Sequence, residues 1–256
     1  MAVVSASGLE GLRTAVLGAT SGIGRAVALR LAEAGAAVIV HGRSGARAEQ
    51  VAAQCTEKGA RDVAVVLAEL ESHPASDHLL DAAWSRWGGL DAWLHIAGAD
   101  TLTGRDAALS FEQKLTKLWA VDVEPTIRLC RQVGERMRAQ GSGSIVTMGW
   151  DQAETGLEGD SGELFAATKG AIMAFTRSLA VSLAPEVRVN CVAPGWIKTK
   201  WGEHASDNWQ ARVIRETPLK RWGSPEDVAD ACCFLVGPGS SFLTGQVMRV
   251  NGGVVR

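Results

Sequence analysis

The sequence predicts an α/β protein, a doubly wound parallel sheet of seven strands with helices on both faces. Apolar segments of strand length alternate along the whole chain with longer segments whose apolar residues recur at helical spacing. The strand segments are continuous apolar runs, as expected for a sheet that is covered on both faces. Parallel strands joined by helices need right-handed crossovers, and such sheets bind ligands at the carboxyl ends of their strands.

The elements follow one another without a linker, repeat or low-complexity segment, so we predict one domain over residues 1–256. Strands are expected at 14–17, 37–40, 63–67, 90–95, 144–148, 187–193 and 246–250. Helices are expected at 25–34, 46–58, 75–87, 111–139, 164–183 and 225–236. Between them we expect an irregular acidic loop at 149–163 and a long excursion, partly helical, at 196–219.

Composition excludes several classes of function. The formal net charge is −2, from 26 basic and 28 acidic residues, which gives no electrostatic footprint for nucleic acid or an anionic membrane. The longest apolar runs have the length of strands, so we expect no bilayer span, and the first residues do not resemble a signal peptide. The five cysteines form no C-x-x-C pair, so we expect no metal site and no disulfide framework, and a reducing cytoplasm.

A glycine-rich turn after the first strand is the first candidate binding element. It reads Gly18-Ala-Thr-Ser-Gly-Ile-Gly24, between a strand and a helix. Glycines let the backbone approach a ligand closely, and the helix N-terminus offers free N–H groups to a phosphate. No Lys-Ser or Lys-Thr follows, so a nucleoside-triphosphate P-loop is not indicated. The alternative is an ordinary strand–helix turn.

Residues after the second, fourth and sixth strands extend this candidate site. Dinucleotide sites often place an acid after the second strand, but this chain has Gly42 followed by Arg43. Arg43 is a candidate for holding a ribose 2′-phosphate, with a solvated loop charge as the alternative. After the fourth strand, the small residues of 97–98 leave room for a ribose, whereas His95 alone is better explained as a packed strand-end histidine. After the sixth strand, the turn at 194–199 ends in a hydroxyl that can bond an amide.

With these pieces placed, the chain resembles the short-chain dehydrogenase/reductase family over essentially its whole length. In pattern it is most similar to the 3-oxoacyl-carrier-protein reductases. The matching residues are Gly18, Gly22, Gly24, Ala97, Gly98, Lys169 within Phe165–Lys169, the segment Asn190–Gly195, Thr199 and the tail Leu243–Gly253.

The resemblance implies a Rossmann-type fold with a nicotinamide cofactor along the strand ends. The segment 42–44 is similar to that of NADP-preferring members, so we expect NADP(H) rather than NAD(H). Thr20, Ser21 and Ile23 would contact phosphate and ribose, Glu69 and Leu70 the adenine, and Ile197 and Thr199 the carboxamide. The full expected cofactor set is Gly18, Thr20, Ser21, Gly22, Ile23, Gly24, Arg43, Ser44, Glu69, Leu70, Ala97, Gly98, Lys169, Pro194, Gly195, Ile197 and Thr199.

The catalytic positions are where the sequence departs from the family it resembles. That family uses an Asn, a Ser, a Tyr and a Lys, and the corresponding positions here are Asp122, Trp150, Phe165 and Lys169. The chain contains no tyrosine that could replace the missing one. Because the loop after the fifth strand looks slightly longer than usual, Asp151 or Gln152 stays an alternative for the Ser position.

Three functions remain open on these residues. The first is an NADP(H)-dependent oxidoreductase acting on an unknown carbonyl or alcohol with a replaced acid. The second is an inactive cofactor-binding regulator or subunit, and the third is a lyase or isomerase. A loop residue could supply the missing acid, or these side chains could form only a solvated loop. The candidates are Asp151, Glu154, Glu158, Asp160, Ser161 and Glu163.

Two further expectations concern the surface. Trp196, Trp201 and Trp209 make the excursion at 196–219 either an apolar lid over a small-molecule substrate or a segment packed down by its own tryptophans. The resemblance also implies a homo-oligomer, most simply a tetramer. The helices at 111–139 and 164–183 would form one interface, because the second is rich in small residues, and the last strand would support another.

Overall fold

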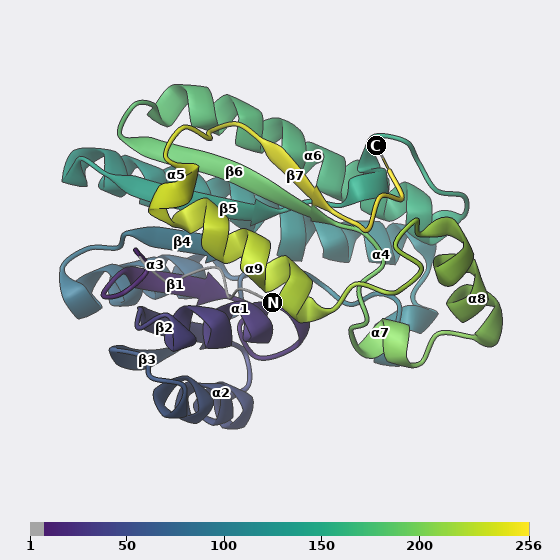
Figure 1. Cartoon of the computed structure of the whole chain (residues 1–256), viewed down its shortest axis with the longest axis horizontal. Coiled ribbons are helices and arrows are strands. Elements are labelled where there is room, and N and C mark those ends of the chain that lie inside the picture. The colour runs from purple at the N-terminus through teal and green to yellow at the C-terminus, as the bar shows by residue number, and fades with distance from the viewer. Residues whose placement is uncertain (1–7, 256) are drawn as a thin grey trace.

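The computed structural model describes residues 8–255 of the chain and shows one seven-stranded parallel sheet. The strand order is β3-β2-β1-β4-β5-β6-β7 (Figure 1). Successive strands are added on one side of β1 up to β3 and on its other side from β4 onward. The strands are β1 Arg13–Leu17, β2 Ala37–Gly42, β3 Asp62–Leu67, β4 Ala92–His95, β5 Gly143–Met148, β6 Val187–Pro194 and β7 Val247–Val250. The doubly wound fold predicted from the sequence is confirmed, with strand boundaries that differ by at most two residues.

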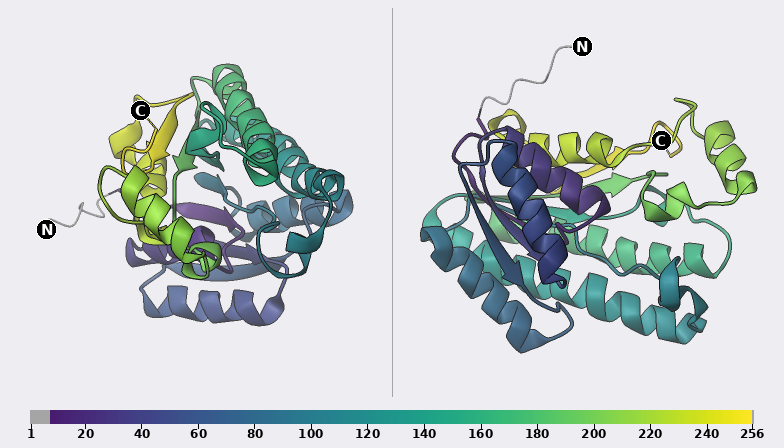
Figure 2. Two further views of the ribbon diagram at one scale, coloured as in Figure 1. Left: turned by 90° about the vertical axis from the view of Figure 1, so that its right-hand side faces the viewer. Right: turned by 90° about the horizontal axis from the view of Figure 1, so that it is seen from below.

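Helices cover both faces of the sheet, as the continuous apolar strands require (Figure 2, left). The helices that form one layer are α1 Gly22–Glu33, α2 Gly45–Glu57 and α9 Pro225–Val236. The opposite layer contains α3 His73–Trp87, α5 Glu124–Gln140 and α6 Asp160–Leu183. Each layer buries its own cluster of aliphatic side chains against the sheet, which fixes where the strand ends meet.

The helix predicted at 111–139 is not continuous. It consists of α4 Phe111–Leu118, a π-helical turn Trp119–Val123 (η2) and α5. Pro125 in the first turn of α5 gives a physical reason, because its ring has no N–H for the carbonyl of Val121 and would collide with it in an α-helix. A π turn carries one extra residue and is frequent at functional sites. Here that turn contains the buried Asp122.

The acidic loop predicted at 149–163 is shorter than expected. It holds a 3-10 turn, η3 Asp151–Ala153, and α6 already begins at Asp160 instead of 164. Asp160 and Glu163 lie in the first helical turn, where acids interact favourably with the helix dipole. By length and composition alone α6 could cross a membrane, although 44% of its most apolar window is buried within this fold.

The excursion after β6 contains two short helices, α7 Lys200–Glu203 and α8 Asp207–Glu216, which lie beyond the sheet (Figure 1). Its tryptophans pack on one another. The ring of Trp196 lies 6.0 Å from that of Trp201 and 5.2 Å from that of Trp209, and Trp222 lies 5.8 Å from Trp201. The structure therefore favours the packing interpretation for these rings.

Candidate active site

The glycine turn between β1 and α1 is too close to its neighbours for larger residues. Gly18 has a left-handed φ of 78°, and a Cβ there would lie 2.7 Å from the Cα of Ala97. A Cβ on Gly24 would lie 2.1 Å from the carbonyl oxygen of Gly18. Ser21 precedes α1 without capping it through its side chain, and the first turn carries no acid. The first N–H groups of α1 therefore remain available to an anion.

A buried histidine, His41 at the end of β2, supports this turn. Its Nδ1 accepts a hydrogen bond of 3.1 Å from the N–H of Gly18, so its Nε2 carries the proton and donates to the carbonyl of Ala68 at 3.2 Å. Burial disfavours the imidazolium and lowers the pKa of His41 to about 4. The sequence analysis did not single out this residue, because its partners come from β1 and from the segment after β3.

The next residue, Gly42, interlocks with the glycine turn. A Cβ at this position would lie 2.3 Å from the Cγ2 of Thr20. Arg43 follows, fully outside the core, and Ser44 precedes α2. At the neighbouring strand end, Glu69 is exposed and Leu70 is buried. The structure thus brings the residues expected on the adenosine side together at the ends of β2 and β3.

The segment after β6 returns to the glycine turn. The Cγ2 of Thr199 would be 3.5 Å from a Cβ on Gly22, although the two residues are far apart in the sequence. Ile197 forms an isolated bridge with Gly223, and Pro194 ends β6. Thr199 of this segment therefore lies beside the glycine turn.

Asp122 and Lys169, two of the predicted catalytic residues, form a buried ion pair. The Lys169 Nζ lies 2.7 Å from Asp122 Oδ2, and Asp122 Oδ1 accepts the N–H of Ala99 at 2.7 Å. Their side chains are 1% and 11% exposed for Asp122 and Lys169. A Cβ on Gly98 would lie 3.0 Å from the same carboxylate, so the pair sits directly against the end of β4.

The other two predicted catalytic residues form an aromatic pair. The rings of Trp150 and Phe165 meet edge to face with centroids 6.3 Å apart. Both side chains are partly exposed. Phe165 lies one helical turn before Lys169 on α6, so the aromatic pair and the ion pair adjoin. At the two positions where the resemblance led us to expect hydroxyls, this chain therefore presents indole and phenyl groups.

Asp151, considered as a replacement acid, is hydrogen-bonded through Oδ2 to Asn251 and not to Lys169, and its Oδ1 has no hydrogen-bond partner within residues 8–255. It is buried, its Oδ2 accepts a hydrogen bond of 3.1 Å from Asn251, and a Cβ on Gly195 would lie 3.1 Å from the same oxygen. Burial raises the pKa of Asp151 to about 6. Gln152, the alternative for the Ser position, is buried with its Oε1 unpaired.

The remaining loop acids are engaged elsewhere or exposed. Glu154 pairs with Arg177 at 2.7 Å and with Arg249, and Glu158 pairs with Arg212 at 2.6 Å. These guanidinium groups lower the pKa values of both glutamates. Asp160, Ser161 and Glu163 belong to the first turn of α6. Within residues 8–255, the carboxylate that contacts Lys169 is that of Asp122.

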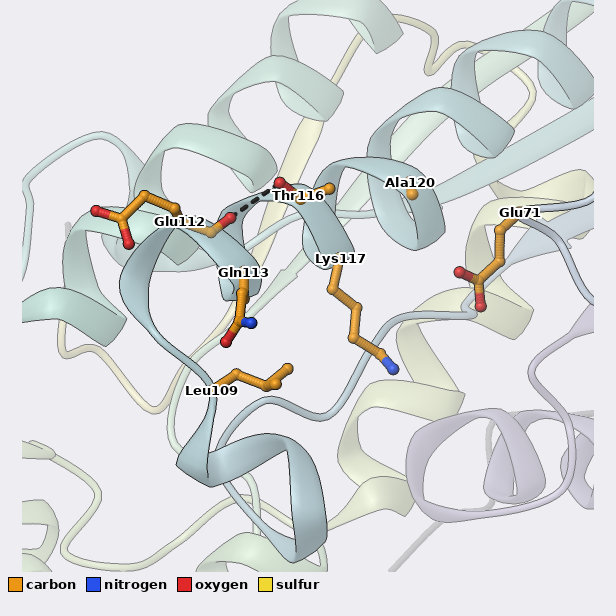
Figure 3. Close-up of a pocket in the computed structure, with 7 residues that line it drawn as sticks. All are labelled: Glu71, Leu109, Glu112, Gln113, Thr116, Lys117 and Ala120. Carbon is orange, nitrogen blue, oxygen red and sulfur yellow. Dashed lines mark hydrogen bonds between the residues drawn. The ribbon is translucent and has the colours of Figure 1, made fainter.

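An open hollow of about 460 Å³ lies away from these residues (Figure 3). Residues of α4, including Lys117, face Glu71 from the segment after β3 across it. None of its lining residues belongs to the predicted site. Residues 8–255 also contain no cluster of His, Cys, Asp or Glu that could hold a metal ion.

Comparison with known proteins identifies the family of the chain. Residues 18–255 match the family model described as enoyl-(acyl carrier protein) reductase. The chain is 35% identical to the 3-oxoacyl-[acyl-carrier-protein] reductase of Aquifex aeolicus, over 96% of this chain and 98% of that protein. It is 31% identical to tropinone reductase-like 3 of Erythroxylum coca, over 95% and 93% of the two chains.

Solved structures agree with these relatives. A 7α-hydroxysteroid dehydrogenase complexed with NADH and 7-oxo glycochenodeoxycholic acid superposes with a TM-score of 0.88 at 26% identity, covering 100% of this chain and 98% of that one. A short-chain type dehydrogenase/reductase from Mycobacterium ulcerans gives a TM-score of 0.87 at 28% identity, covering 96% and 90%. By sequence, by fold and by the arrangement of its strand ends, the chain belongs to the short-chain dehydrogenase/reductase family of oxidoreductases.

Proposed function

We propose that this protein is an NADP(H)-binding oxidoreductase of the family whose reacting site lacks the usual hydroxyl acid. The observation that supports a dinucleotide is the glycine turn, since Cβ atoms at Gly18 and Gly24 would collide with Ala97 and with the Gly18 carbonyl, so the tight turn that opens α1 needs glycines. The free N–H groups of α1 would hold the pyrophosphate, and Thr199 would meet the carboxamide. When bound in its reduced form, such a dinucleotide supplies a hydride.

The preference for NADP(H) is supported by Gly42 and Arg43. An acid that bonds the ribose 2′-hydroxyl needs a Cβ at Gly42, and that Cβ would collide with Thr20. The exposed Arg43 guanidinium is suited to a 2′-phosphate, because charge-assisted hydrogen bonds contribute roughly 1.5–3 kcal/mol each. The expected preference for NADPH over NADH is therefore about tenfold or more.

Tryptophan fluorescence titrations with NADPH and NADH test this proposal. Arg43→Ala should weaken NADPH binding about tenfold and leave NADH binding nearly unchanged. Arg47→Ala, an equally exposed arginine on α2, is the matched control. Equal affinities for the two nucleotides, or no loss in Arg43→Ala, would contradict the preference. Absence of binding to both would contradict the dinucleotide site itself.

The chemistry proposed here excludes ordinary ketone reduction by a tyrosine acid. Loss of a general acid costs about 10²–10⁴ in rate, and loss of an oxyanion donor about 10²–10³. Phe165 cannot donate a proton, and Trp150 has a single indole N–H. The lack of a hydroxyl at both Phe165 and Trp150 also favours a second candidate, a dinucleotide-binding regulator or inactive subunit. A lyase or isomerase is a third candidate. NADPH oxidation with any acceptor separates the first candidate from the other two.

We further propose that the protein is a cytoplasmic homotetramer. Val181 on α6 is 81% exposed and Trp119 beside α5 is 47% exposed, which gives the α5–α6 face apolar surface to bury. Phe242, fully exposed before β7, supports a second interface near the last strand. The five unbridged, buried cysteines suit a reducing compartment. Light scattering at micromolar concentration should give four times the chain mass, and a monomer would contradict this proposal.

A further inference from the structure

The reacting end of the proposed site combines an aromatic surface with an ion pair in which the two opposite charges face each other. Trp150 and Phe165 present partly exposed rings, and Lys169 is neutralised by Asp122 at 2.7 Å. In residues 149–169, no tyrosine or cysteine is present to protonate an alkoxide. An acceptor suited to this surface must therefore take up a hydride without needing a proton.

We propose that the acceptor is an iminium cation, R₂C=NR₂⁺, a substrate class that rests on the proposed dinucleotide-binding function. When the carbon of this group gains a hydride from a reduced nicotinamide dinucleotide, the electron pair of the C=N π bond becomes the lone pair on nitrogen. The products are a neutral amine and the oxidised dinucleotide. Atoms and charge balance with no proton, whereas a ketone would become an alkoxide that has to be protonated.

The aromatic pair has a positive role in this proposal. A cation held over the face of an indole or phenyl ring is stabilised by about 0.5–2 kcal/mol, more strongly as water is excluded. A neutral ketone gains nothing comparable from the same rings. Asp160 and Glu163, exposed in the turn of α6 that precedes Phe165, add negative charge to this end of the helix.

The nearby acids and bases do not offer a simpler route to ketones. The Lys169 ammonium already donates a hydrogen bond of 2.7 Å to the buried Asp122 carboxylate, so this donor is engaged. Asp151 Oδ2 accepts a hydrogen bond from Asn251, and within residues 8–255 no hydrogen bond joins Asp151 to Lys169. Glu154 and Glu158 are each paired with arginine. The residues present therefore favour an acceptor that needs no acid.

Binding is the first test, because it does not depend on turnover. The probe is N-methyl-3,4-dihydroisoquinolinium, a permanent iminium cation, compared with 1-tetralone, a neutral ketone of similar shape. Calorimetry in excess 1,4,5,6-tetrahydro-NADP, whose nicotinamide ring is neutral and has no hydride to transfer, should show the cation binding at least about fivefold more tightly. Phe165→Leu should weaken cation binding by about 3- to 30-fold and change ketone binding much less.

Turnover is the second test. NADPH oxidation with the iminium probe should be at least about 10²-fold faster than with 1-tetralone, and constant between pH 6 and 8 because no proton enters the step. Phe165→Tyr, which restores a hydroxyl, should raise the ratio of ketone to iminium rates about tenfold or more. Phe242→Tyr makes the same change on a fully exposed ring away from the site and should leave the ratio unaltered.

The outcomes separate this inference from the proposed function. If NADPH binds but the iminium is neither bound more tightly nor reduced faster than the ketone, the iminium inference is wrong and the dinucleotide site stands. Rapid ketone reduction by the unmodified protein would also overturn the inference. Failure of NADPH to bind in the fluorescence titration would overturn the proposed function as well.

Discussion

The proposed dinucleotide end of this site (Gly18, Gly24 and Gly42) and its proposed reacting end (Trp150 and Phe165) differ in how strictly packing restricts their residues. At the dinucleotide end, Gly18, Gly24 and Gly42 each face atoms less than 3 Å from where a Cβ would stand, so backbone geometry fixes the residue type. At the reacting end, Trp150 and Phe165, which we propose to stand at the hydroxyl positions of the family, are partly exposed and contact each other edge to face. Binding set by close backbone approach tolerates few substitutions, whereas chemistry set by side chains can change on an unaltered fold.

The largest expected effect tests whether the reacting end has acquired a structural role. Asp122→Ala should lower the free energy of unfolding by about 3–5 kcal/mol, because it leaves the buried Lys169 ammonium uncompensated and the N–H of Ala99 without its acceptor. Asp122→Asn should cost less, since its amide oxygen can still accept from Ala99. Chemical denaturation measures both variants.

Asp81→Ala is the control for this experiment. It removes an exposed carboxylate that pairs with Arg136 at 2.5 Å, and such surface pairs contribute about 0–1 kcal/mol. A loss in Asp122→Ala no larger than in this control would show that the buried pair has little structural value.

A smaller effect concerns pH. Because the pKa of Asp151 is raised to about 6, the native state binds a proton more tightly than the unfolded chain between about pH 4 and 6. The stability that this group provides is therefore present below pH 4 and lost as the pH rises through 6. Asp151→Asn mimics the protonated form, so its advantage over the unmodified protein should grow from near zero at pH 4 to roughly 3 kcal/mol at pH 7.

The quantity to measure is the difference in the free energy of unfolding between Asp151→Asn and the unmodified protein at each pH. The pH profile of either protein alone does not isolate Asp151. The pKa of His41 is lowered to about 4, so the stability that it contributes rises with pH over the same window and opposes the Asp151 effect in each profile. A difference that stayed constant from pH 4 to 7 would refute the raised pKa.

A steric prediction concerns the dinucleotide end. Gly42→Ala should destabilise the protein by about 1–3 kcal/mol, because the new methyl meets the Cγ2 of Thr20 at 2.3 Å unless the backbone moves. Thr20→Ala removes that obstacle, so the double variant should recover most of the loss, with a coupling energy of about 1 kcal/mol or more. Additive losses from thermal denaturation would show that Thr20 does not restrict position 42.

The smallest expected change in the free energy of unfolding is at the aromatic pair of Trp150 and Phe165. Trp150→Phe and Phe165→Tyr each keep an aromatic ring on a partly exposed surface, so each should change the free energy of unfolding by less than about 1 kcal/mol. A loss above about 3 kcal/mol in either variant would place this pair among the fixed parts of the fold, and the contrast between the two ends would disappear.

The sequence predicted the fold and the glycine turn well, because alternating periodicity and short motifs are local signals. The structure brings the four residues proposed as catalytic together as an ion pair beside an aromatic pair, while their catalytic roles stay a prediction. The bond between Asp151 and Asn251 joins residues 100 positions apart, and no local pattern indicates it. The collision between Thr20 and Gly42 likewise depends on how two strand ends pack. The π turn was missed because its apolar residues still fit helical spacing.

That π turn has a consequence for insertions and deletions. Trp119–Val123 accommodates one residue more than an α-helix would, and α5 continues from it with its apolar face on the sheet. Deleting a single residue here would restore regular helical hydrogen bonding. It would also rotate α4, before the turn, relative to α5, after it, by about 100° around the helix axis. Either Asp122 would leave Lys169 or α5 would turn polar residues toward the sheet. Natural variants of this protein should therefore vary in length elsewhere and keep the spacing between Phe111 and Pro125 fixed.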